Sequence, residues 1–187
     1  MLLGRFNLKY LALLRGINVG GKNIISKEDL CQLFVDLGFE NVRTYIQSGN
    51  ILFRNGKKSA KELAKGIEEE LSARFSYAAR AVVLSYDQYK SAVESAPDCW
   101  GKDNQQKHNA LFLLGDGTPK KVYAELPPPK LGIESITLGR NAVFWSVSKE
   151  NLTKTSYMKL PKLQVYQDVT IRNHNTVFKL LQLFDEI

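Results

Sequence analysis

The spacing of apolar residues along the chain switches between the two periods that distinguish strands from helices. Residues 10–14 are apolar at every position, which predicts a buried strand in a sheet that is covered on both faces. A glycine-rich loop over residues 15–25 follows. Ser26 then opens a helix, with Asp29 three residues later as its partner in an N-terminal cap.

The remainder of the first half reads as a hairpin, a charged helix, a strand and another helix. Gly49 and Asn50 lie in the hairpin turn, where positive φ angles are needed and these residue types tolerate them. The expected elements are strands over residues 42–47 and 51–54, a helix from about Ser59 to Phe75, a strand over residues 79–84 and a helix capped by Ser85.

After a polar stretch without apolar periodicity, a similar order of elements begins again. The expected elements are a strand over residues 109–114, a short helix over 119–126, strands over 135–138 and 142–147, a helix from Ser148 to about Leu160, a strand over 165–170 and a helix that starts at Asn173. A β-α-β-β-α-β order plus a helix is the ferredoxin-like arrangement. We therefore expect an α+β fold of two ferredoxin-like halves packed together with mainly antiparallel sheets. Residues 1–96 form the first half, residues 97–108 a linker and residues 109–187 the second half.

Composition and charge place few limits on the partner. The 187 residues carry a net charge of +7, but no run of five or six like charges occurs, so the excess is spread over the surface. Nucleic-acid binding is therefore only weakly supported. The two cysteines form no disulfide framework and suit a reducing compartment. With no signal peptide and no apolar span of membrane length, we expect a cytoplasmic protein without membrane or cofactor.

The most unusual segment is RGINVGGKN, residues 15–23. Gly16 to Lys22 has the spacing of a Walker A phosphate loop, but Asn23 stands where that loop needs a hydroxyl, and the helix begins only after it. In one interpretation the glycines serve only to give the loop its positive φ angles. The other interpretation is an anion site, in which the amides of Gly20 and Gly21 act together with Arg15 and Lys22.

Two further segments are candidates for the same chemistry. In TYIQSGN, residues 44–50, the side chains of Tyr45, Gln47 and Asn50 either satisfy the turn or line a pocket. In TIRNHNT, residues 170–176, Asn173 is a natural N-cap, and Arg172 lies beside the positive end of the helix.

Signals for catalysis are weak. His174 and Asp168 are the nearest candidates for a general base, and no metal site of usual spacing can be drawn from two histidines and two distant cysteines. The sequence thus leaves an enzyme open as an alternative without pointing to a reaction.

The three polar segments also carry a family resemblance. RGINVGGKN, TYIQSGN and TIRN followed by Asn175-Thr176 resemble the signature of a widespread bacterial family of domains of unknown function, number sixteen ninety-seven. The resemblance extends over about residues 9–185. It implies an α+β fold and a bacterial cytoplasmic protein, and it implies no activity. Many members carry an aromatic residue, often Trp, at the position of His174, so no role is carried over to this histidine.

The leading hypothesis is a binding protein for an anionic, phosphate-bearing ligand, such as a nucleotide, a sugar phosphate or a nucleic-acid backbone. Its expected contacts are Arg15, Asn18, Gly20, Gly21, Lys22, Gln47, Asn50, Arg172 and Asn173. The alternatives are a hydrolase or transferase that uses the same cleft, and a protein-interaction module. The first loop is expected at the end of the first strand, and the 48–50 turn at the opposite edge of the sheet. A single binding site therefore requires the three segments to come together in the folded chain.

Overall fold

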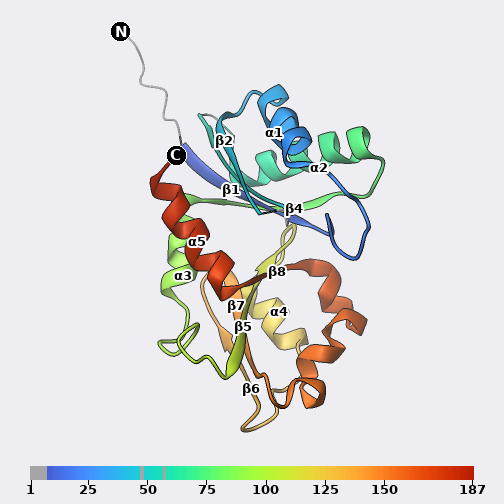
Figure 1. Cartoon of the computed structure of the whole chain (residues 1–187). Coiled ribbons are helices and arrows are strands. Elements are labelled where there is room, and N and C mark those ends of the chain that lie inside the picture. Colours follow the sequence, from blue (N-terminus) through green and yellow to red (C-terminus); the bar gives the residue numbers. More distant parts are fainter. Residues whose placement is uncertain (1–7, 47–48, 57) are drawn as a thin grey trace. The chain divides into compact units, whose positions relative to one another are not determined.

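The structure, a computed structural model, describes residues 8–46, 49–56 and 58–187. These residues form two compact units (Figure 1). The first contains the described residues up to Tyr89 together with Gln182–Ile187, and the second contains Lys90–Leu181. Residues 97–108 lie within the second unit, where Trp100 is only 2% exposed. No helix in these ranges is both long and apolar enough to cross a membrane.

The first unit is built on a four-stranded antiparallel sheet with the strand order β2-β3-β1-β4. Because β1 lies between β3 and β4, this is a ferredoxin-like arrangement, as the order of elements predicts. The elements are β1 (Leu8–Arg15), α1 (Lys27–Asp36), β2 (Glu40–Tyr45), β3 (Asn50–Asn55), α2 (Ala60–Phe75), β4 (Arg80–Ser85) and α3 (Tyr86–Glu94), which continues into the second unit.

The core of the first unit lies between this sheet and the helices α1 and α2. Tyr10, Ala12 and Leu14 of β1 belong to it, and Phe53 of β3 stacks on Phe39 with 4.5 Å between ring centres. The residues of β1 that alternate with these are also buried, so both faces of the strand are covered. The unbroken apolar run over residues 10–14 predicts this double burial, and the structure confirms it.

The helix ends follow from local side chains. The Ser26 hydroxyl accepts a hydrogen bond from the Asp29 amide at 2.9 Å, so the predicted cap of α1 is confirmed. Ser59 and Glu62 form a reciprocal capping box at the start of α2. Each cap satisfies amides that a helix leaves without partners in its first turn.

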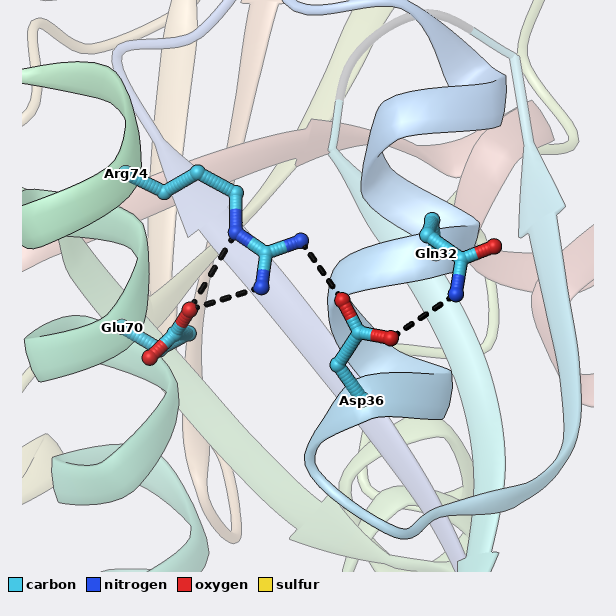
Figure 2. A network of polar contacts seen from close by, with 4 residues as sticks. All are labelled: Gln32, Asp36, Glu70 and Arg74. Carbon is cyan, nitrogen blue, oxygen red and sulfur yellow. Dashed lines mark hydrogen bonds and ion pairs between the residues drawn. The ribbon is translucent and has the colours of Figure 1, made fainter.

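A polar network joins the end of α1 to the last turn of α2. Figure 2 shows Arg74 between Glu70 of its own helix and Asp36 of α1, with 2.8 Å to each carboxylate. Gln32 donates a further hydrogen bond to Asp36 at 2.8 Å. The bond from Gln32, followed by that from Arg74, lowers the pKa of the Asp36 carboxyl, which therefore stays charged.

The second unit contains another four-stranded antiparallel sheet, with the strand order β6-β7-β5-β8. One of its faces packs on α4 and on a run of short helices around Trp145, Leu111 and Val169. The elements are β5 (Gln106–Leu113), α4 (Pro119–Glu125), β6 (Glu134–Leu138), β7 (Ala142–Ser148), the 3-10 helices η1 (Leu152–Lys154), η2 (Ser156–Lys162) and η3 (Gln164–Asp168), β8 (Val169–Asn173) and α5 (His174–Asp185).

The expected α-helix from Ser148 to Leu160 is wrong, because this segment forms 3-10 turns. Thr155 is extended, with ψ at 154°, and Pro161 lies inside η2 without an amide to donate. The strand expected over residues 165–170 also begins later, since Val165 belongs to η3 and β8 starts at Val169. Short 3-10 turns let several side chains of this run reach the core where a continuous helix would have turned some of them away.

Candidate functional site

The glycine-rich loop after β1 is a miniature hairpin. Gly20 and Gly21 have φ angles of 58° and 74°, and Val19 and Lys22 form a bridge in which the Lys22 amide donates to the Val19 carbonyl at 3.1 Å. Two successive positive φ angles are typical of a tight two-residue turn. The loop turns back on itself before α1 begins, and so it differs from a Walker A loop, whose amides converge directly ahead of a helix.

Two asparagines hold the base of this loop. The amide of Asn18 binds the backbone of Ile25 twice, donating to its carbonyl at 3.0 Å and accepting from its N–H at 2.9 Å. Asn23 donates to the Gly16 carbonyl at 2.8 Å. Both asparagines have positive φ angles, which Asn tolerates better than most residues. The loop thus fixes its own shape, while Gly20, Gly21 and Lys22 stay exposed at its tip.

The turn between β2 and β3 lies at the same end of the sheet as this loop, so the expectation of opposite edges is wrong. The register pairs Leu13 with Asn50, and the Leu14 amide donates to the Gly49 carbonyl at 2.8 Å. The physical reason is that β1 and β3 are antiparallel neighbours, so the end of one meets the beginning of the other. The first two predicted segments are therefore adjacent.

Gly49 allows this close approach. A Cβ atom built there would lie 2.7 Å from Cβ of Leu14 and 2.9 Å from Cδ1 of Ile17, and φ is 67°. Asn50 is fully buried, and its side chain donates to the Tyr45 carbonyl at 3.0 Å, so it holds the turn from within. Gln47, another predicted contact, lies outside the described residues.

Cationic side chains gather at this end of the first unit. Arg15 is the last residue of β1 and pairs in register with Arg80 of β4, so the two side chains share one face. Arg80 also contacts Glu68 at 3.4 Å, and Lys22 is exposed at the loop tip. Of these groups, Arg15, Arg80 and Lys22 carry positive charge and Glu68 carries negative charge.

Arg172 and Asn173 belong to the second unit and point to opposite faces of β8. Asn173 accepts from the Thr176 amide at 2.9 Å, which confirms the predicted N-cap of α5. Arg172 is buried, and its guanidinium donates to the Thr170 hydroxyl at 2.8 Å and to the Ile171 carbonyl at 2.9 Å. The Nη1 atom of Arg172 is thus bonded to groups of its own unit.

The two candidate bases do not form a pair. Asp168 precedes the five-residue strand β8 and His174 follows it, so about 20 Å of extended chain separates them. His174 packs edge-on against Trp100 and His108, with 6.1 Å and 5.4 Å between ring centres. Burial, followed by the neighbouring His108, lowers the pKa of His174, which stays neutral at physiological pH.

The sequence analysis missed a polar group at the start of β5. His108 is buried, and its Nδ1 lies 2.8 Å from the hydroxyl of Ser146, its cross-strand partner in β7. The next residue, Asn109, is buried as well, and its side-chain nitrogen Nδ2 has no hydrogen-bond partner among the residues that the structure describes. The missed signal was the length of β5, which begins at Gln106 and so brings His108 into the sheet.

Metal chemistry finds no support in the part of the chain that the structure describes. No group of three or more His, Cys, Asp or Glu side chains is placed there to hold a metal ion. The cysteines Cys31 and Cys99 are free.

Comparisons with known proteins identify a family and a similar solved structure. Residues 8–144 match the family model described as "Protein of unknown function (DUF1697)". A solved structure described as that of a conserved bacterial protein from Streptococcus pneumoniae is similar, with a TM-score of 0.84 and 32% sequence identity. That similarity covers 95% of this chain and 98% of that chain. A search of curated proteins found no match.

Proposed function

The chain belongs to the family of proteins of unknown function DUF1697, and we propose that this protein binds an anionic, phosphate-bearing ligand. Membership of the family supplies no activity, so the proposal is based on the structure of the chain itself. The proposed site is the end of the first unit's sheet where the glycine-rich loop meets the turn between β2 and β3. Its ligand contacts are the amides of Gly20 and Gly21 together with the charges of Arg15 and Lys22.

The meeting of the two polar segments is the observation that supports this proposal. They are some thirty residues apart in the sequence, yet the Leu14 amide bonds to Gly49 and a side chain at Gly49 would collide with Ile17. Arg15 ends β1 next to this contact, and the loop that follows it has Gly20, Gly21 and Lys22 exposed at its tip. Backbone N–H groups beside cations are the usual chemistry of an anion site.

The proposed roles of the asparagines follow from their contacts. Asn18 and Asn50 bond to the backbone of their own loops, so we assign them to holding the site in shape. Gln47 stays a candidate contact. The free cysteines are in keeping with our proposal of a cytoplasmic protein, since thiols persist in a reducing compartment.

A thermal-shift screen of the full chain tests the proposal. The probes are inorganic phosphate, nucleotides, sugar phosphates and short RNA and DNA, each at low and at moderate salt. A ligand at a hundred times its dissociation constant adds about 2.7 kcal/mol to the free energy of unfolding. A small ligand is expected to show little salt dependence, whereas nucleic acid is expected to lose affinity steeply with salt.

Two lysine variants make the screen specific. Lys22→Ala is expected to abolish most of the shift, and Lys65→Ala, which removes the same charge from an exposed position on α2, is expected to preserve it. If no probe stabilises the protein, or if both variants respond like the unaltered chain, the proposed site does not exist. The loop would then be a scaffold or an interaction surface, for which exposed Val19 and Ile24 are candidates.

A further inference from the structure

We propose that the second unit holds a separate site for an oxyanion, at the point where Asn109 of β5 lies beside the start of α5. The oxyanion is the oxygen-rich group of a phosphate or a carboxylate. This site lies in a different compact unit from the glycine-rich loop and is independent of the function proposed above.

The first observation is a buried hydrogen-bond donor that has no acceptor. Asn109 is 3% exposed, and its Nδ2 atom has no partner among the described residues. A buried amide without a partner is costly, so proteins rarely keep one unless something else satisfies it. Because the orphaned group is N–H, the missing partner is an acceptor, as an oxyanion is.

The second observation is the position of this donor beside a helix start. Asn109 pairs in register with Asn173, so the two side chains share one face of the sheet. Asn173 is the N-cap of the twelve-residue helix α5 and accepts from the Thr176 amide at 2.9 Å. The positive end of the helix dipole favours an anion near this point.

The third observation is the set of groups around Asn109 on the same face. Lys107 lies two residues earlier in β5, and its ammonium is 5.9 Å from the ring centre of Tyr157. Tyr157 in turn packs on Trp145, the partner of Asn109 in β7, with 5.3 Å between ring centres. Burial, followed by neighbouring Tyr166, raises the pKa of Tyr157 to about 12, so its hydroxyl keeps its proton at neutral pH. This face of the sheet thus carries a buried amide donor, a phenol and a cation.

A titration followed through the Asn109 side chain itself tests the proposal. The full chain is labelled with ¹⁵N-asparagine, and the Asn109 amide signals are assigned from their loss in Asn109→Asp. Sodium phosphate, and separately sodium acetate, is added against sodium chloride of equal ionic strength. A saturable shift of these signals with either anion supports the site, and the tighter anion identifies the class of ligand.

Variants separate this site from the other unit and from general charge effects. Asn173→Asp keeps a good N-cap but adds a negative charge, and Lys107→Gln removes the cation, so each is expected to weaken binding about tenfold. Lys120→Gln on α4 and Lys22→Ala in the first unit are expected to leave the midpoint of the anion titration unchanged. The proposal is overturned if chloride moves the Asn109 signals as much as the two anions do. It is equally overturned if neither anion moves them, or if Asn173→Asp and Lys107→Gln both titrate like the unaltered chain.

Discussion

Replacing Glu134 is expected to make the second unit unfold at a much lower denaturant concentration, because this carboxylate organises the 3-10 segment after β7. Glu134 begins β6 and is 8% exposed. It accepts hydrogen bonds from the Ser156 amide at 2.9 and 3.1 Å, from the Lys130 amide at 3.1 Å and from Trp145 Nε1 at 3.1 Å. It thereby ties the start of η2 and the loop before β6 to the central strand β7.

The magnitude follows from the donors that the substitution would strand. In Glu134→Ala the Ser156 and Lys130 amides and the Trp145 indole lose their acceptor together. Each buried donor left without a partner costs about 1–3 kcal/mol, but water and relaxation recover part of the sum. We therefore expect a loss of about 3–5 kcal/mol in the free energy of unfolding, in the range found when one partner of a buried charged pair is removed.

The assay uses the position of the two tryptophans. Trp100 and Trp145 are the only tryptophans of the chain and both lie in the second unit, so urea unfolding followed by tryptophan fluorescence reports on that unit. Glu134→Gln keeps one acceptor oxygen and is expected to lose about half as much stability as the Ala variant. The control Glu125→Gln alters an ion pair at 4.0 Å on the surface of α4 and is expected to change stability by less than about 0.5 kcal/mol. If Glu134→Ala unfolds at the same urea concentration as this control, the carboxylate does not hold the segment as we argue.

The pH dependence of this contribution has a definite sign. Burial alone would raise the pKa of Glu134, but the hydrogen bonds from Ser156, Lys130 and Trp145 outweigh it and lower that pKa below its ordinary value. The stability that Glu134 supplies is thus complete above the pKa of the unfolded chain and is lost as the pH falls through the folded value. The difference between the unaltered chain and Glu134→Gln is expected to shrink in that acidic window.

Two other perturbations are expected to give clear results. Gly49→Ala forces a φ of 67° on an ordinary residue and drives its methyl group against Leu14, which we expect to cost about 2–4 kcal/mol; thermal melts followed by circular dichroism measure this, and an unchanged melting temperature would contradict it. His174 has a lowered pKa and faces His108 and Lys149, so stability is expected to be complete above about pH 6.5 and to fall as the pH drops toward its folded pKa. In His174→Phe the free energy of unfolding, measured by urea unfolding with fluorescence, should change less with pH in this range. If its pH dependence is the same as in the unaltered chain, other groups cause it.

The order of elements could be predicted because local patterns determine it. The strand over residues 10–14 and the helix after Ser26 follow from apolar spacing and from one hydroxyl that caps three residues ahead. Asn173 could be identified as an N-cap for the same reason, since the bond that it makes spans only three residues. Fold class followed from the order of strands and helices, because few topologies accommodate a β-α-β-β-α-β chain.

The segment after β7 could not be predicted, because its conformation depends on distant contacts. The apolar residues there have helical spacing. However, the Ser156 amide donates to Glu134, 22 residues away, and Thr155 is extended. No local pattern reveals that partner. The buried His108 was missed for a similar reason, since its hydrogen bond to Ser146 depends on the register of two strands.

In the candidate site too, the sequence shows the residue types but not the contacts that their side chains make. The sequence made the glycines and Lys22 candidates, and that stays a prediction. It could not show that the Asn18 and Asn50 side chains bond to backbone groups of their own loops, several residues away. Because these side chains bond to backbone groups, the contacts that we propose for an anion at this end are the N–H groups of Gly20 and Gly21 and the charges of Arg15 and Lys22. Such groups hold an anion but neither accept a proton at neutral pH nor attack a bond. A hydrolase or transferase at this position would need a general base in addition to the contacts that we propose.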